Sequence, residues 1–258
     1  MLHLELYCAA AIVLWACILI VLERLFPYQQ GYKIFRSEFF SDLFLYTFAQ
    51  SYLLSIVIAY LIRGIDAATG ITRAGLVSDW SFGAQLLFFF VVHDLWQYWF
   101  HRLEHRTKLF WRIHEAGHAP MHVDWLAGSR SHAIEILIAQ TFEFAPIFLL
   151  GATPEIAIVK GMIDAIWGMF NHSNINIKMG PILYILNGPE LHRFHHDLDA
   201  PAGGANLATK ISLWDHLFGT AYYPKNKLPR YGLQEHIAFP YGNYLKQLVF
   251  VFRSEGED

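Results

Sequence analysis

Residues 80–105 read WSFGAQLLFFFVVHDLWQYWFHRLEH, an apolar run that continues into a polar segment rich in histidine. The first thirteen residues predict a helix that begins within a membrane. No glycine or proline interrupts the chain between Val91 and His105, so we expect the same helix to continue to His105 and to leave the membrane near its polar end. One helix is therefore predicted to carry both a membrane span and a polar site.

The polar end of this helix has the spacing of a metal site. Positions four apart on a helix differ by only about 40° in direction, so His101 and His105 project from one face. Asp94 and Tyr98 lie above them on that face. A metal ion can be held from this stripe.

The composition of the whole chain supports membrane residence. Its 258 residues are 55% hydrophobic and only 16% charged, with a mean hydropathy of +0.30, whereas soluble domains carry roughly 25% charged residues. The net charge of -3 and the lack of any Lys/Arg run argue against nucleic-acid binding. The two cysteines are interpreted as small apolar side chains, since they have neither C-x-x-C spacing nor a second pair.

Further apolar stretches predict further membrane helices. We expect spans at about 4–24, 42–63 and 80–101. Residues 6–22 and 43–62 carry no charge, and apolar runs of this length can cross roughly 30 Å of hydrocarbon. The first is interpreted as a span and not as a signal peptide, since it lacks a basic start and a small-residue cleavage site. Residues 133–170 contain five charged residues and predict a hairpin that enters the bilayer only in part. The predicted fold is an all-α integral membrane protein, a single domain over 1–258, with about four membrane-embedded helices.

The orientation follows from Lys and Arg in the short loops, which favour the cytoplasmic side. Four basic residues follow the third span and three lie between the first two spans, but only Arg63 and Arg73 lie between the second and third. We therefore expect a multi-pass protein whose histidine-rich helical cap is cytosolic. A short amphipathic helix is expected at about 241–252, on the membrane surface or over the site.

The clustering of the histidines is more informative than any one of them. Seven of the fourteen fall between residues 93 and 132, and three more lie in 192–196. His114 and His118 repeat the four-residue spacing, with His122 a further turn along. Neutral imidazole suits iron, zinc and copper, and at a membrane boundary it costs less desolvation than a carboxylate. Isolated histidines such as His3, His93 and His236 are more simply interpreted as surface or boundary residues.

Several motifs in order resemble the fatty acid hydroxylase/sterol desaturase superfamily. They are His93-Asp94-Leu-Trp-Gln-Tyr98-Trp-Phe-His101-Arg102-Leu-Glu-His105, Leu109-Phe-Trp111-Arg-Ile-His114, Arg130-Ser-His132-Ala-Ile-Glu135, Asn171-His172-Ser173-Asn174-Ile175, His192-Arg-Phe-His195-His196-Asp197 and Leu213-Trp214-Asp215-His-Leu-Phe218-Gly219-Thr220. The resemblance implies a membrane fold with a cytosolic cap, a di-iron centre held by histidines, and oxygen-dependent hydroxylation or desaturation of a lipid.

The resemblance also implies a ligand set. The histidine boxes run over 101–196, and the matching positions are His101, His105, His114, His118, His172, His192, His195 and His196. His122 and His132 are possible additional ligands. Asp94 is a candidate acceptor for the second N–H of a ligating imidazole, an interaction that metal-bound histidines usually make.

The second box departs from the family pattern H-x-x-H-H, because it reads His114-Glu-Ala-Gly117-His118. Three explanations stay open: His118 and His122 supply the ligands in a shifted arrangement, one metal position is open, or the site is degraded.

The expected cofactors are two iron ions and O2. The chain has no G-x-G-x-x-G and no cysteine motif for an iron–sulfur cluster, so a separate electron donor such as a cytochrome b5-like protein or ferredoxin is implied. Alternatives are a zinc-dependent membrane hydrolase, although zinc sites usually take only three or four protein ligands; a non-catalytic membrane scaffold derived from the enzyme, suggested by Gly117; and a histidine-lined transporter.

Overall fold

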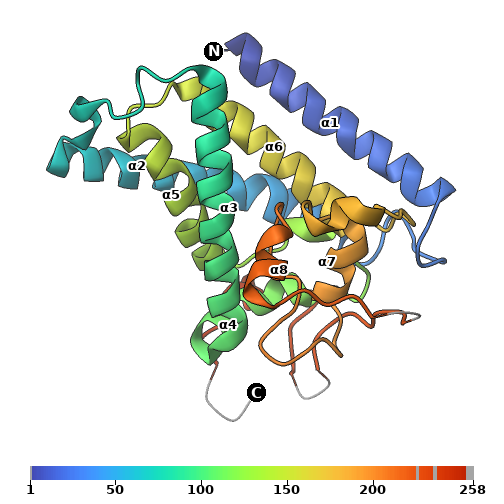
Figure 1. Ribbon diagram of the computed structural model, residues 1–258. Helices are drawn as coiled ribbons and strands as arrows, with labels where there is room; N and C mark the ends of the chain where they lie inside the picture. Colours follow the sequence, from blue (N-terminus) through green and yellow to red (C-terminus); the bar gives the residue numbers. More distant parts are fainter. Residues whose placement is uncertain (1, 225–226, 235–236, 254–258) are drawn as a thin grey trace.

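The computed structural model describes residues 2–224, 227–234 and 237–253, and these residues form helices and connecting loops without a β-sheet (Figure 1). The longer elements are α1 (Leu2–Leu25), η1 (Ser41–Gln50), α2 (Ser51–Thr69), α3 (Phe82–Arg106), α4 (Lys108–His118), α5 (Ala133–Leu149) and α6 (Pro154–His172). The shorter ones are η2 (Ile71–Ala74), η3 (Ala127–Ser129), η4 (Gly180–Tyr184), α7 (Pro189–His195), α8 (Leu213–Phe218) and α9 (Tyr244–Phe250). The all-α prediction is confirmed.

Local sequence signals set the ends of the principal helices. The Ser81 side chain accepts a hydrogen bond from the backbone N–H of Ala84 and so caps the start of α3. Pro154 occupies the first turn of α6, where its missing N–H is not needed. Gly70, with a φ of 61°, ends α2 in the left-handed region.

Two of the described helical segments are long and apolar enough to cross a membrane, Leu2–Leu25 and Ser41–Thr69. Only 11% and 22% of their most apolar windows are buried in the structure, so these segments are not the core helices of a compact soluble fold. The second segment begins as the π-helix η1, which the sequence did not predict. The other predicted membrane segments form as α3, α5 and α6, whose embedding stays a prediction.

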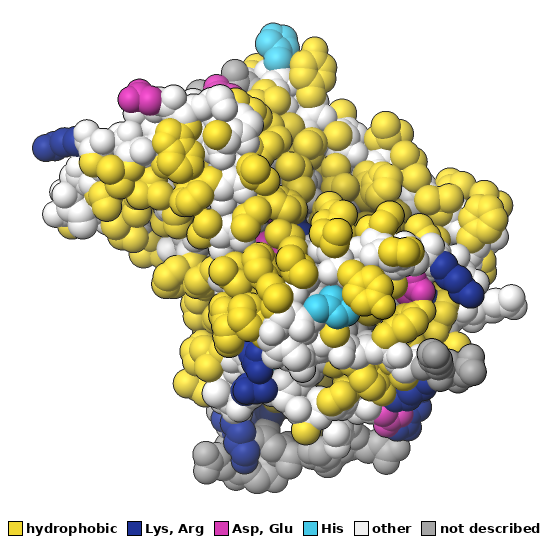
Figure 2. Space-filling model, in the orientation of Figure 1, with side chains coloured by type: hydrophobic (Ala, Val, Ile, Leu, Met, Phe, Trp, Pro, Cys, Tyr) yellow, Lys and Arg dark blue, Asp and Glu magenta, His cyan; other side chains and the backbone are white. Residues whose placement is uncertain are grey.

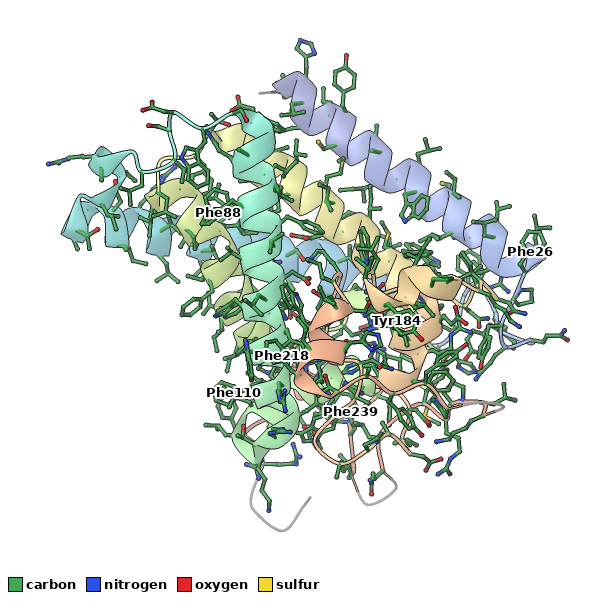
Figure 3. The ribbon with its side chains drawn as sticks, in the orientation of Figure 1. Phe26, Phe88, Phe110, Tyr184, Phe218 and Phe239 are labelled. Carbon is green, nitrogen blue, oxygen red and sulfur yellow. The ribbon has the colours of Figure 1, made fainter. Side chains whose placement is uncertain are left out.

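Apolar side chains cover the outer faces of these helices, as the broad yellow surface in Figure 2 shows. On α1 the exposed side chains include Leu6, Tyr7, Val13, Leu14 and Val21. Aromatic rings such as Phe26 and Phe88 point outward or between helices along the same surface (Figure 3). This surface fits a hydrocarbon environment.

The charges predicted in the 133–170 hairpin lie inside the bundle. The Lys160 ammonium is fully buried and donates to Glu143, at 2.5 Å, and to Asp164, at 2.7 Å. His93 Nδ1 lies 2.9 Å from the same ammonium. Because the charges are paired inside the bundle, α5 and α6 can present apolar faces outward.

The histidine-rich segments gather at one end of the bundle. There the Glu23 carboxylate, at the end of α1, accepts the backbone N–H groups of Trp125 and Asn174. At the opposite end the Val77 N–H donates to the carbonyl of Leu150. The loops and short helices after α3 therefore form one layer at the end where α1 and α3 finish (Figure 1).

Candidate metal centre

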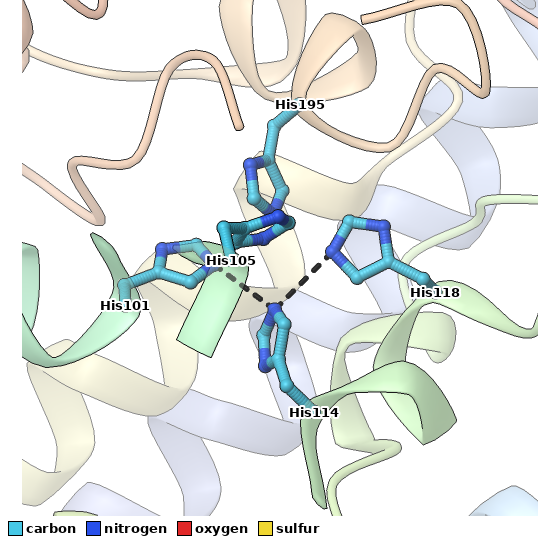
Figure 4. Close-up of side chains that lie close together, drawn as sticks. All are labelled: His101, His105, His114, His118 and His195. Carbon is cyan, nitrogen blue, oxygen red and sulfur yellow. Dashed lines mark hydrogen bonds between the residues drawn. The ribbon is translucent and has the colours of Figure 1, made fainter. Parts of the chain in front are cut away.

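Eight buried or half-buried histidines form two adjacent groups at this end of the bundle. The first group has five members, whose nearest ring nitrogens all lie within 4.8 Å of one another: His101, His105, His114, His118 and His195 (Figure 4). The second has three members within the same limit: His172, His192 and His196. These are the eight positions that the sequence suggested as ligands.

The five-histidine group is assembled by a helical corner and a third helix. His101 and His105 come from the last turns of α3, and His114 and His118 come from α4, which is separated from α3 by the single residue Thr107. Both pairs use four-residue spacing, so each pair shares a helix face. His195, from α7, lies opposite, with its ring centroid 4.4 Å from that of His101 and 4.7 Å from that of His118.

In the three-histidine group the Nε2 atoms form a triangle. The separations are 3.0 Å between His192 and His172, 3.1 Å between His196 and His172, and 3.1 Å between His196 and His192. The groups touch, since the rings of His118 and His196 lie 4.5 Å apart between centroids. The arrangement is suited to two neighbouring metal ions.

Backbone carbonyls fix which nitrogen of each ring faces inward. His101 Nδ1 donates to Leu207 O at 2.7 Å, His195 Nδ1 to Ala205 O at 2.9 Å, and His172 Nδ1 to Gly168 O at 2.8 Å. A carbonyl oxygen only accepts hydrogen bonds, so these Nδ1 atoms carry the proton. The Nε2 atoms then present lone pairs to the centre, as metal ligands must.

The donor set fits a cation better than a hydrogen-bond network. His101 Nε2 and His114 Nε2 lie 3.1 Å apart, and His118 Nε2 is 3.2 Å from His114 Nε2. His105 Nε2 is buried without a hydrogen-bond partner among the described residues. Burial also lowers the pKa of His105, His118 and His195 and keeps these imidazoles in the neutral, ligating form.

Two carboxylates lie behind His114. Its Nδ1 is 3.0 Å from Glu135 Oε1 and 3.5 Å from Glu104 Oε2. Burial lowers the pKa of His114, but Glu104 and Glu135 outweigh burial and raise it to about 9. Burial raises the pKa of Glu104 itself to about 8. The carboxylates thus hold a proton on Nδ1 of His114 and direct its Nε2 to the centre.

The sequence suggested that Asp94 accepts a hydrogen bond directly from a ligating imidazole, but in the structure it binds a loop that in turn orients the histidines. It accepts from the backbone N–H groups of Lys210 and Ile211, and from the side chains of Thr209 and Trp214. Asp215 accepts from the N–H groups of Leu207 and Ala208. The two aspartates fix the segment 205–211, whose carbonyls orient His101 and His195.

The two possible additional ligands lie outside both groups. His132 caps α5: its Nδ1 accepts the Ile134 N–H and its Nε2 donates to Leu248 O. His122 packs edge-on against Tyr32, with 4.6 Å between ring centroids. A Cβ atom at Gly117 would lie 3.1 Å from the Arg130 carbonyl oxygen, so this position faces the backbone of the next loop.

Comparison with known sequences agrees with this geometry. The sequence model for "Fatty acid hydroxylase" matches residues 86–220, just over half of the chain, and this region includes all eight histidines. The chain belongs to the fatty acid hydroxylase family. This assignment confirms the resemblance seen in the histidine motifs.

The chain is similar to curated members of three kinds of lipid enzyme. It is 27% identical to the ornithine lipid hydroxylase OlsE of Rhizobium tropici over 80% of this chain and 64% of that protein. It is 28% identical to human alkylglycerol monooxygenase over 56% of this chain and 32% of that protein. It is 27% identical to the sphingolipid C4-hydroxylase sur2 of Schizosaccharomyces pombe over 56% of this chain and 50% of that protein. The matches thus span about one third to two thirds of the relatives, and no solved structure matches significantly.

Sequence reasoning missed the groups behind the ligands. Glu104 and Glu135 were given no role, although Glu104 is one helical turn from His101 and Glu135 follows His132 at capping-box spacing. The carbonyls of Gly168, Ala205 and Leu207 carry no signal in the sequence, because every residue has one.

Proposed function

We propose that this chain is an oxygen-dependent, di-iron lipid hydroxylase or desaturase, and hence an oxidoreductase. The observation that carries the proposal is the convergence of eight imidazoles in two touching groups, at least three of which have their lone pairs fixed inward by carbonyl oxygens. The family assignment and the relatives, which are named as enzymes that act on lipids, support the same function.

The number of nitrogens favours iron over zinc. A structural zinc site is closed by four ligands and a catalytic one by three, whereas the first group alone offers five imidazoles. The ligand count therefore argues against a zinc-dependent hydrolase. His114-Glu115-Ala116-Gly117-His118 does fit the H-E-x-x-H pattern of zinc enzymes, but the Glu115 carboxylate, which would be the general base, is paired with Arg253. The retention of all eight histidines argues against a scaffold that has lost its metals, despite Gly117.

Two irons held by these histidines would supply oxygen activation and oxidation of an unactivated C–H bond. In hydroxylation, one oxygen atom enters the lipid and the other leaves as water, with two electrons and two protons supplied from outside the chain. A separate donor, such as a cytochrome b5-like protein or ferredoxin, would deliver the electrons. The residues of this chain orient the ligands through Glu135 and the 205–211 segment, and they bury the centre away from water.

In this proposal the chain is a multi-pass membrane protein with its histidine-rich layer in the cytoplasm. α1 and the Ser41–Thr69 segment supply two spans, and α3 with the α5–α6 hairpin would supply the rest. The basic residues that follow α3 would mark the cytoplasmic end.

Metal content tests the proposal directly. The full-length chain would be purified in detergent after anaerobic ferrous loading, and iron per chain would be measured by mass spectrometry for the wild type, His195→Ala and a control, His3→Ala, at an exposed position of α1. We expect about two irons in the wild type and the control, with clear loss in His195→Ala. Oxygen consumption with reductant and lipid would then test turnover. One iron or none in the wild type, unchanged by His195→Ala, would contradict the di-iron centre.

A further inference from the structure

A pocket of about 480 Å³ lies directly beside the two histidine groups. Its lining includes His105, His118 and His195 of the first group and His196 of the second. Trp111 forms part of its apolar wall. The volume falls in the range of small-molecule sites. A molecule in this pocket would meet both halves of the proposed metal centre.

The charges that line the pocket do not cancel. Asp197 is paired with Lys227, at 2.6 Å, and Arg253 is paired with Glu115, at 2.5 Å. Arg106 and Lys108 are exposed and make no ion pair with the described residues. Within the part of the chain that the structure describes, two unpaired cations therefore remain beside the centre. Lys and Arg side chains mark this lower end of the molecule in Figure 2. A negatively charged ligand group would complement them.

These cations also lie at the depth of lipid headgroups. α3 has 25 residues and is therefore about 37 Å long at about 1.5 Å per residue. The hydrocarbon layer is about 30 Å thick, so the last residues of α3 extend just beyond it. Leu103 and Leu109, on either side of Arg106 and Lys108, are 40% and 72% exposed. Apolar residues that flank exposed cations are typical of a membrane interface, where basic residues attract anionic lipids.

We propose that Arg106 and Lys108 bind the anionic headgroup of a membrane lipid, and that the oxidised carbon of this lipid lies close to the headgroup. The inference rests on the proposed function for the oxidation, but the binding site stands on the pocket and its charges. Arg106 directly follows His105, so a headgroup held by Arg106 places the first carbons of the lipid, and not the far end of its chain, near the histidines.

Binding of short-chain lipids tests the site without turnover. The full-length chain in neutral detergent would be titrated with dihexanoyl phosphatidylglycerol, with dihexanoyl phosphatidylcholine, and with inorganic phosphate. The variant Arg106→Gln/Lys108→Gln would be compared with Arg63→Gln/Arg73→Gln, which removes two exposed cations from the opposite side of the predicted membrane. Iron content and Tm would report on folding in every variant.

We expect the wild type and the control to bind phosphatidylglycerol at least tenfold more tightly than phosphatidylcholine. The Arg106→Gln/Lys108→Gln variant should lose this preference while it retains its iron and its Tm. Equal binding of the two lipids by the wild type, or an unchanged preference in that variant, would overturn the headgroup site. Binding of inorganic phosphate as tight as that of phosphatidylglycerol would assign the pocket to a free anion and would also overturn it.

Two further readouts separate this inference from the proposed function. Headgroup-dependent binding in a chain that holds iron but never oxidises lipid would support the pocket and contradict the proposed reaction. In an active preparation, oxygen inserted near the far end of the acyl chain would overturn the inference about position. A slower electron transfer from an acidic donor protein, with lipid binding unchanged in Arg106→Gln/Lys108→Gln, would assign the cations to the donor and overturn the headgroup site.

Discussion

His114 Nδ1 lies 3.0 Å from Oε1 of Glu135, and the other oxygen of this carboxylate accepts the backbone N–H of His132 at 3.3 Å. One side chain at the start of α5 therefore completes the helix cap and also orients a proposed ligand on α4. This carboxylate connects the first turn of α5 to the five-histidine group, so a change at Glu135 should alter metal binding.

Glu135→Gln tests this link. The amide can still cap the helix, but it removes the negative charge that holds the proton on Nδ1 of His114. Changes of this kind usually lower metal affinity or activity about 10- to 100-fold, and we expect a loss of iron affinity in this range. Competition with a chelator measures it. Asp66→Asn, which alters a carboxylate that accepts from Thr72 away from the centre, should leave the affinity unchanged, and an equal loss in both variants would refute the link.

Two neighbouring glycines allow a second test. Gly204 has a φ of +83°, and a Cβ atom there would lie 2.8 Å from Cγ of His105. Gly203 has a φ of +85°, but its Cβ would meet only the Arg106 side chain, at 3.6 Å. An alanine at either site costs about 1–2 kcal/mol of backbone strain, whereas only Gly204→Ala displaces His105.

We therefore expect both alanine variants to lose stability, Gly204→Ala more so because its Cβ also meets Leu207 at 2.8 Å, but Gly204→Ala alone to lose iron. Thermal unfolding and iron content, measured on the same samples, separate the two effects. Equal iron content in Gly203→Ala and Gly204→Ala would show that the ring of His105 moves aside freely or that it does not bind metal.

The candidate ligands were predictable from sequence because side-chain direction on a helix follows from spacing. The four-residue repeats at His101/His105 and His114/His118 required only that the segments be helical. The segment 205–211 was not predictable, because its role depends on two backbone carbonyls that long-range contacts to Asp94 and Asp215 place beside the imidazoles. The pairing of Lys160 with Glu143 likewise depends on how α5 packs against α6.

Metal removal should destabilise the fold itself. Without a cation, His105 Nε2 stays buried with no hydrogen-bond partner among the described residues, and a buried polar atom without a partner costs free energy. A ligand that binds only the folded state raises stability as its concentration exceeds its Kd. We expect a clearly lower Tm after anaerobic chelation, restored by ferrous iron and not by magnesium, which prefers oxygen ligands. An unchanged Tm would indicate that metal does not occupy the histidine groups.

A buried ion network away from the histidines gives a prediction for stability. The Asp42 carboxylate is fully buried and receives Arg130, at 2.5 Å, and Arg36, at 2.6 Å. Asp42→Asn leaves these guanidinium groups short of a buried counter-charge, which costs about 3–5 kcal/mol in comparable pairs. Glu38 lies 3.7 Å from the same Arg36, with a more exposed side chain, so Glu38→Gln should cost at most about 1 kcal/mol. Unfolding in detergent measures the difference, and similar losses would contradict it.

The last prediction separates the two metal positions. A Cβ atom at Gly128, in η3, would lie 2.5 Å from Nδ1 and 2.9 Å from Cγ of His172, a member of the three-histidine group. Gly168 supplies the carbonyl that orients the same ring, but a Cβ at Gly168 would enter open space within α6. Gly128→Ala should therefore displace His172, while Gly168→Ala should be neutral or, through helix propensity, stabilising by up to about 1 kcal/mol.

If each group holds one metal, Gly128→Ala should retain about one iron per chain and Gly168→Ala about two. Because the five-histidine group does not include His172, the iron that remains in Gly128→Ala should be lost only when His114→Ala is added. Loss of both irons in Gly128→Ala alone would instead show that the two positions fill as one cooperative unit. Retention of both would contradict this prediction and would show that the ring of His172 moves aside freely or that it does not bind metal.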